Sequence, residues 1–303
     1  MLNIYYGSET ADKSKFIFEH IKGRTLLLVP DQFSLQAEKD AFFYLGEKSL
    51  MDLIVVDFSS LGNKAVTESG GRKPAMIDKY GRHILLTRII DEIEDELKVF
   101  RGFSWKNSFA DMMNSMISEM KRYDITPEDI AEAEAGLDEG SYLKYKLHDI
   151  ETIFMSYQKR IEGKYLDSED YITFYGEKIT ESRLVNGAEV WIYGFDIFTP
   201  KNLQVIEKLI STAAAVNIVM TYEPSGSTEN RFSDARFLAA EDDEDLFGLT
   251  GYVISKLVQI AENLGEKVKL QAIDGELRTS VWNMADAEGP VTLAAILNTN
   301  CMI

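Results

Sequence analysis

Cysteine and histidine are both scarce in this sequence. Cysteine occurs once, at Cys301, among 303 residues, so no disulfide can form within one chain. This scarcity is typical of proteins from a reducing compartment, and we expect a cytoplasmic location. The three histidines, His20, His83 and His148, lie far apart and lack the short spacings of metal ligands. We therefore expect no metal site.

Long apolar runs are also missing. None approaches the ~20 residues that a membrane-spanning helix requires. Charged residues appear from Glu9 onward, whereas a signal peptide would continue with an apolar segment. We therefore expect no membrane association.

Positive charge is in deficit. The chain has 32 lysines and arginines against 50 aspartates and glutamates, which gives a formal net charge of −18. This balance argues against a free-standing, non-specific nucleic-acid binder, because such proteins need a basic surface. It leaves open a local DNA groove, or a subunit whose partner supplies the positive charge.

Short apolar runs of strand length occur at both ends of the sequence and alternate with helical patterns. Between them, apolar residues at helical spacing dominate, which predicts a block of helices. Alternating strands and helices favour a parallel sheet. The strand-like runs are 2–6, 25–29, 53–56, 189–195, 216–222 and 268–270.

The sequence thus predicts an α/β fold whose parallel sheet is interrupted by a helical insertion. We assign 1–70 plus 186–275 to a discontinuous α/β domain, 71–185 to a helical subdomain, and 276–303 to an irregular or truncated tail. A stripe of methionines within 109–120 could be a pliable binding face, but its helical spacing favours core packing.

The segment after the first strand resembles a phosphate-binding loop, G-x-x-x-x-G-K-[ST]. Gly7, Lys13 and Ser14 match this pattern, and Asp12 replaces its second glycine. Lys13 could still reach a phosphate and Ser14 could hold Mg²⁺, so ATP with Mg²⁺ is a possible but weakened ligand. Alternatively, Asp12 caps the following helix in a loop that has lost its ligand.

Six segments, in this order, resemble the N-terminal region of AddB, the second subunit of the bacterial AddAB helicase–nuclease. Each segment is a weak signal alone, whereas all six in family order are specific. The segments are Leu28–Glu38, Phe58–Leu61, Lys121–Tyr123 with Ile125–Asp129, Lys146–Asp149, Tyr165–Tyr171 and Trp191–Pro200.

The resemblance implies a RecA-like, P-loop NTPase-type sheet with the 1A/1B subdomain arrangement of superfamily 1 helicases. It also implies an AddA-type helicase/nuclease partner and a role in double-strand break repair and recombination. Family members are much longer and end in a nuclease domain with an iron–sulfur cluster. The cysteines for that cluster are absent here, so we expect neither the cluster nor exonuclease activity in this segment.

The family pattern also indicates which catalytic groups are missing. An ATPase of this type needs a carboxylate pair at the end of the strand 190–193, to hold Mg²⁺ and orient water. Those positions are Tyr193 and Gly194, and Asp196 lies out of register. No glutamine follows Tyr222 to sense the γ-phosphate. We therefore expect no ATP hydrolysis.

The resemblance further implies contacts to single-stranded DNA in the turns after the second and third strands and in a loop at the same sheet edge. Polar side chains can bind phosphates or base edges, and aromatic rings can stack on bases. For Phe58 and Phe195, core packing is the alternative. The candidates are Gln32, Ser34, Phe58, Ser60, Phe195 and Phe198.

The resemblance indicates that reading of the family's hotspot sequence is lost here or directed to a different sequence. The family reads the hotspot Chi with an arginine and a tryptophan near the Phe58 segment, and this chain has Ser60 and Asn63 there. Further candidates for phosphate contacts, for which charged surface is the alternative, are Arg72, Lys73, Lys121 and Arg122.

The sequence therefore favours a catalytically degenerate helicase-like segment that binds or scans single-stranded DNA. Two alternatives stay open: an active P-loop ATPase or kinase, and a structural module that docks a partner.

Overall fold

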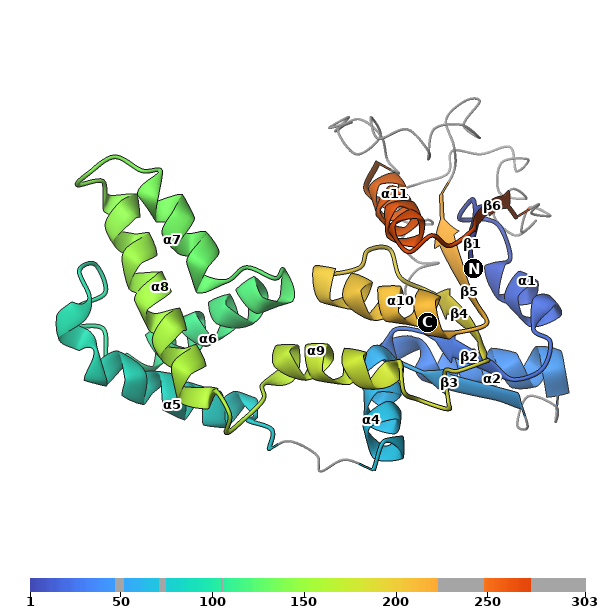
Figure 1. Cartoon of the computed structure of the whole chain (residues 1–303), viewed down its shortest axis with the longest axis horizontal. Helices are drawn as coiled ribbons and strands as arrows, with labels where there is room; N and C mark the ends of the chain where they lie inside the picture. The colour runs from blue at the N-terminus through green and yellow to red at the C-terminus, as the bar shows by residue number, and fades with distance from the viewer. Residues whose placement is uncertain (47–51, 71–74, 105, 223–247, 274–303) are drawn as a thin grey trace, which may run out of the picture.

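The computed structural model describes residues 1–46, 52–70, 75–104, 106–222 and 248–273. Figure 1 shows two regions, one built on a β-sheet and one made only of helices. The predicted tail, 276–303, and the candidates Arg72 and Lys73 lie outside the described residues.

The sheet of the described residues has six strands, all parallel, in the order β3-β2-β4-β5-β1-β6. Its four middle strands are largely buried and rich in aliphatic residues, as expected for a parallel sheet covered on both faces. The strands are β1 (Leu2–Gly7), β2 (Thr25–Leu28), β3 (Leu53–Val56), β4 (Glu189–Tyr193), β5 (Ala215–Thr221) and β6 (Val268–Ala272). The predicted α/β fold with a parallel sheet is confirmed, and the chain has a RecA-like α/β architecture.

Helices cover both faces of this sheet (Figure 1). On one face, α1 (Lys13–His20) and α2 (Ser34–Leu45) pack over Leu27 and Trp191. On the other, four helices bury Ile4, Val190 and Ile218. Those four are α4 (Phe58–Glu68), α9 (Ser168–Ile179), α10 (Pro200–Thr212) and α11 (Gly248–Asn263).

The helical region has a core of its own. Its buried residues run from Leu86 to Ile161 and include Phe109 and Phe154. Met113 is buried and Met116 and Met120 pack against this core, which supports the core interpretation for these three methionines, whereas Met112 is 45% exposed. The helices of this region are α5 (Lys79–Glu92), α6 (Asn107–Arg122), α7 (Pro127–Ala135) and α8 (Tyr142–Ile161), with the 3₁₀ turn η3 (Glu94–Glu96) after α5. In the sheet region, a second 3₁₀ turn, η1 (Asp31–Phe33), precedes α2.

The two chain crossings between the regions lie side by side. Leu166 N–H donates to Ala75 O, and Ile77 N–H donates to Leu166 O, each at 2.9 Å. Beyond this bridge, α9 rejoins the sheet region, because its Tyr175 and Ile179 are buried in the sheet's core. The packing boundary therefore lies just before α9, although the sequence assigned everything up to 185 to the insertion. The 1A/1B arrangement stays a prediction.

Within the described residues, no helix combines the length and the apolar character that crossing a membrane requires.

Candidate nucleotide and DNA site at the carboxyl edge of the sheet

Because all strands run in one direction, their carboxyl ends meet at one edge of the sheet, where ligands of open α/β folds bind. There the loops after β1, β2 and β4 and the end of β5 line a cavity of about 360 Å³. Its walls are Glu9, Ala11, Asp12, Lys13 and Ser14, then Gln32 and Phe33, then Tyr193, Gly194, Phe195 and Asp196, and Val219 and Thr221. We call this space the edge cavity.

The loop between β1 and α1 is folded on itself. Asp12 Oδ1 accepts from Lys15 N–H at 3.0 Å and so caps α1, as the alternative interpretation of this residue predicted. Lys13 is buried, and its Nζ donates to Ser8 O at 2.6 Å. The matching positions of the phosphate-loop pattern are therefore assembled, with the lysine bonded to its own loop.

Gly7 has a packing reason of its own. A Cβ at this position would lie 3.2 Å from Ala11 Cβ and 3.3 Å from Ile273 Cβ. The glycine thus lets the loop and the segment after β6 approach the end of β1, with or without a ligand.

The charges around the edge cavity do not suit a triphosphate. Glu9, Asp12 and Asp196 bring three carboxylates to its wall, and Lys13 brings one ammonium. Like charges disfavour a bound polyanion unless cations neutralise them.

The end of β4 carries no metal-binding group. Tyr193 is the last residue of β4, and Gly194 follows it with φ of 84°. A Cβ at Gly194 would lie 3.2 Å from Pro30 Cδ, so a side chain here meets both backbone strain and a neighbour. Asp196 is exposed beyond this turn. The backbone at Gly194 thus favours glycine, at a position where the sequence alignment with ATPases of this type expects a carboxylate.

Only some of the DNA candidates line the edge cavity. Gln32 is exposed and lines the edge cavity beside Lys13 and Ser14, together with Phe195. Ser34 is half-buried and begins α2 directly after η1.

Phe58 and Phe198, by contrast, lie in the core under this edge. Phe195 joins them, with ring centroids 5.4 Å from Phe58 and 5.3 Å from Phe198. This packing supports the core interpretation for Phe58. Ser60 donates to Asp57 Oδ2 at 2.5 Å and so belongs to the cap of α4.

One aromatic residue was missed. Phe33 lies between Gln32 and Ser34, lines the edge cavity and is 46% exposed. Its ring is thus the more accessible one for stacking. The available signal was its position in the same loop, but a phenylalanine beside an apolar strand is more often core.

Two of the basic candidates serve the fold. Lys121 Nζ lies 2.6 Å from both Asp167 Oδ2 and Asp170 Oδ2 and is buried. Arg122 pairs with Glu169 at 3.3 Å. These contacts join the helical region to the start of α9 rather than presenting a free cation.

Comparison with known proteins gives the family. The family model described as "ADDB, N-terminal" matches residues 4–283. The chain belongs to this AddB N-terminal family. The resemblance stated from six sequence segments is thereby confirmed.

Curated relatives of this AddB-type chain are named as one subunit of an ATP-dependent helicase/deoxyribonuclease. The protein from Clostridium kluyveri is 35% identical over 245 residues, which is 78% of this chain and 21% of the relative. The proteins from Alkaliphilus metalliredigens and Alkaliphilus oremlandii are 33% and 31% identical and cover 87% and 89% of the chain. The chain spans 21–23% of the length of these three relatives.

Proposed function

We propose that this AddB-type segment binds or scans single-stranded DNA during double-strand break repair and recombination, without hydrolysing ATP. The proposal that the chain does not hydrolyse ATP is supported by the residues at the end of β4. Aligned on β4, the carboxylate pair of an ATPase of this type would fall at Tyr193 and Gly194, and the positive φ of Gly194 disfavours an acidic side chain there.

The DNA half is supported by the groups gathered at the sheet edge. Gln32 offers an amide for phosphates or base edges, and the exposed Phe33 offers a ring for stacking. Among the described residues that line the edge cavity, Lys13 is the only cation and lies beside three carboxylates, which favours contacts to bases over contacts to many phosphates. A strand read by its bases fits this edge better than one held by charge.

An AddA-type helicase/nuclease is the proposed partner, because the relatives are named as one subunit of a helicase/deoxyribonuclease. Docking of that partner is a second candidate function. It is favoured by a cavity of about 520 Å³ between α10 and α11, which we call the α10–α11 groove. Leu249 and Tyr252 line it and are 61% and 43% exposed, and neighbouring exposed apolar side chains of this kind can mark an interaction site.

ATP hydrolysis is the sharpest test of the first proposal. We expect turnover well below about 1 s⁻¹ with Mg²⁺-ATP and single-stranded DNA, since active enzymes of this kind exceed that rate. Turnover above it would favour the alternative of an active P-loop enzyme. A parallel titration with a fluorescent ATP analogue, on the chain and on Lys13→Ala, measures any residual binding.

DNA binding is tested by fluorescence anisotropy with a labelled oligonucleotide at several salt concentrations. Each phosphate contact steepens the fall of log K with log [salt] by nearly one unit. We expect measurable binding with a shallow slope, because Lys13 is the only cation among the described residues that line the edge cavity. No binding at low salt would favour the docking module.

A further inference from the structure

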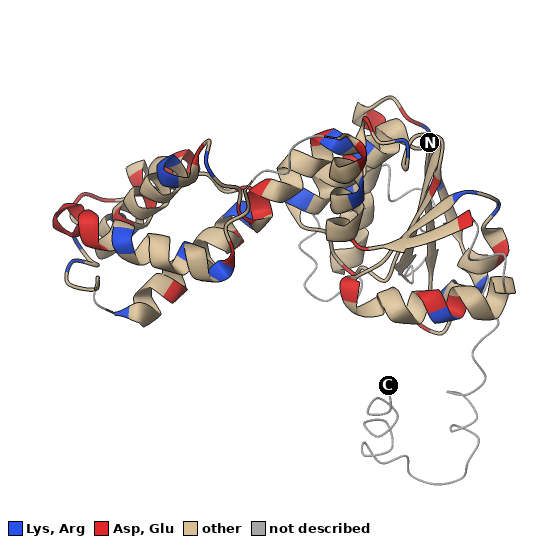
Figure 2. Ribbon diagram, turned by 90° about the horizontal axis from the view of Figure 1, so that it is seen from below, with Lys and Arg blue, Asp and Glu red and all other residues tan. Residues whose placement is uncertain are grey.

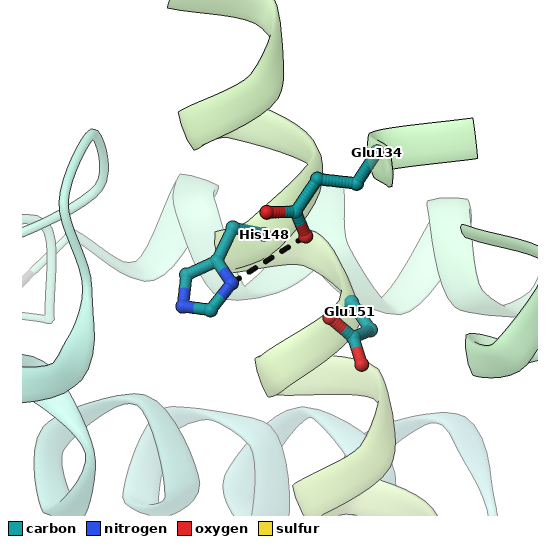
Figure 3. Close-up of side chains that lie close together, drawn as sticks. All are labelled: Glu134, His148 and Glu151. Carbon is teal, nitrogen blue, oxygen red and sulfur yellow. Dashed lines mark ion pairs between the residues drawn. The ribbon is translucent and has the colours of Figure 1, made fainter. Parts of the chain in front are cut away.

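Three metal-ligating side chains meet where α7 packs against α8. Glu134 comes from the end of α7, and His148 and Glu151 come from α8 (Figure 3). The Nδ1 atom of His148 lies 3.5 Å from Glu134 Oε2. One ligand atom from each of the three residues lies within 4.8 Å of the other two.

The fold places these residues together for simple reasons. His148 and Glu151 are three residues apart on one helix, so they project from the same face. Residues 136–141 turn the chain back, which lays α7 along that face. The side chains of Glu134 and His148 are only 17% and 34% exposed, so their donor atoms lie between the two helices and are largely shielded from solvent. Sequence spacing alone could not reveal this three-residue cluster, because Glu134 lies on a different helix from His148 and Glu151.

The charge of the three side chains suits a cation. With neutral imidazole, the two carboxylates carry a charge of about −2. The neighbouring Lys144 donates to Glu139 at 2.6 Å, and the charge of Glu134 also helps to raise the pKa of Lys144. A divalent cation would neutralise both carboxylates and accept the imidazole lone pair.

We propose that Glu134, His148 and Glu151 bind a divalent transition-metal ion of the zinc class. One imidazole nitrogen with two carboxylate oxygens suits Zn²⁺ and its neighbours, whereas Ca²⁺ and Mg²⁺ take oxygen ligands alone. Bonds of about 2.0 Å need donor atoms about 3.3 Å apart, so small side-chain rotations complete the site. Three protein ligands leave one position for water, and the ion cross-links α7 to α8.

The test is calorimetric titration of Zn²⁺ into the chain, with Cys301→Ser in every variant so that its thiol contributes nothing. We expect one ion per chain, with affinity at least tenfold weaker in His148→Ala and in Glu151→Gln. His83→Ala is the matched control, because His83 Nδ1 also lies beside a carboxylate, 2.8 Å from Asp111 Oδ1. That variant should bind Zn²⁺ like the parent.

A second readout does not depend on variants folding well. The chain has only three histidines, so their imidazole proton signals can be assigned, and Co²⁺ should broaden or shift those of His148 before those of His20 and His83. Equal affinity of the parent and His148→Ala, or Co²⁺ effects shared equally by all three histidines, would overturn the proposal.

Discussion

Gly194 shows how a single residue limits what the edge cavity can do. Its φ of 84° is a conformation that residues with a Cβ rarely adopt, and the space beside it is filled by Pro30 at 3.2 Å. A nucleotide motor needs an acidic group at this point of the sheet edge. An acidic side chain placed at Gly194 would therefore meet both backbone strain and a neighbour.

We predict that Gly194→Ala lowers the free energy of unfolding by about 1–2 kcal/mol, the cost of a left-handed conformation for a residue with a Cβ. Urea denaturation measures this. Gly136→Ala is the matched control, because Gly136 has φ of −76° and its Cβ would meet nothing closer than Ala133 O at 3.6 Å. Equal stability of the two variants would contradict a role for strain at Gly194.

At the scale of elements, the start of α9 is the joint between the two regions. Asp167 Oδ1 accepts from the backbone of Glu169 and Asp170 at 3.1 and 3.0 Å, which caps α9. Its Oδ2 accepts from Lys121 of α6 at 2.6 Å and from Tyr157 of α8 at 3.1 Å. The buried carboxylate of Asp167 thus connects α6, α8 and α9 through hydrogen bonds.

We predict that Asp167→Ala destabilises the chain by about 3 kcal/mol, because it removes a helix cap and leaves buried Lys121 with one partner fewer. Asp78→Ala is the control. Asp78 caps α5 through Gly81 N–H at 2.7 Å in an exposed setting, so only the cap is lost, at about 1 kcal/mol. Urea denaturation compares them, and similar losses would mean that the ion network adds nothing.

The same carboxyl predicts a pH dependence. Burial alone raises the pKa of Asp167, but the Lys121 ammonium and the bonds from Lys121, Asp170 N–H and Tyr157 outweigh it and hold the pKa below its ordinary value. A lowered pKa in the folded state contributes stability above the unfolded value, about 3.9, and this is lost as pH falls through the folded value.

We therefore expect the stability difference between the parent and Asp167→Asn to be largest near neutral pH and to shrink below about pH 4. Urea denaturation at a series of pH values measures it. A difference that stays constant down to about pH 3 would show that the charge of Asp167 contributes nothing.

Local signals predicted most of the elements. The run Leu53–Val56 is a strand with the predicted bounds, because four apolar residues in a row suit a sheet packed on both faces. Thr126 and Pro127 begin α7 with a capping box, and Gly46 ends α2 with φ of 60°. Caps and positive φ depend on one or two residues, so sequence reveals them.

Packing between distant residues was not predictable in this way. Phe58 was a candidate for DNA stacking, yet Asp57 caps a helix that begins at Phe58 and turns its ring toward Phe195. Likewise, the helical spacing of α9 does not say which core it joins. Both outcomes depend on contacts made across more than a hundred residues.

At the scale of the whole molecule, negative charge is not confined to one region. Figure 2 shows acidic and basic residues on both the helical region and the sheet region, with a net charge of −18 over the chain. Long-range attraction of DNA is therefore weak. If the chain binds single-stranded DNA as proposed, short-range contacts such as stacking at the sheet edge would supply the affinity.

We predict that Phe33→Ala weakens binding of single-stranded DNA by about 1–3 kcal/mol, the usual value of one stacked base. Phe43→Ala is the control, because Phe43 is an even more exposed phenylalanine, at 79%, that does not line the edge cavity. Fluorescence anisotropy measures both. Equal losses, or none, would place the DNA elsewhere than at this edge.

The α10–α11 groove predicts where an AddA-type partner would contact the chain. A pair of exposed apolar side chains, Leu249 and Tyr252, lines it. We expect Leu249→Ser with Tyr252→Ser to weaken binding of this partner about tenfold or more, because aromatic and aliphatic anchors dominate such interfaces. Surface plasmon resonance measures the affinity.

The helical region provides a matched control for this double substitution. Tyr142 and Leu143 are 70% and 50% exposed at the start of α8, so Tyr142→Ser with Leu143→Ser removes the same two side-chain types from another surface. If docking uses the groove, this control binds the partner like the parent. If both double variants bind equally well, the exposed apolar surface between α10 and α11 has another purpose, and single-stranded DNA binding is left as the function that the sheet edge supports.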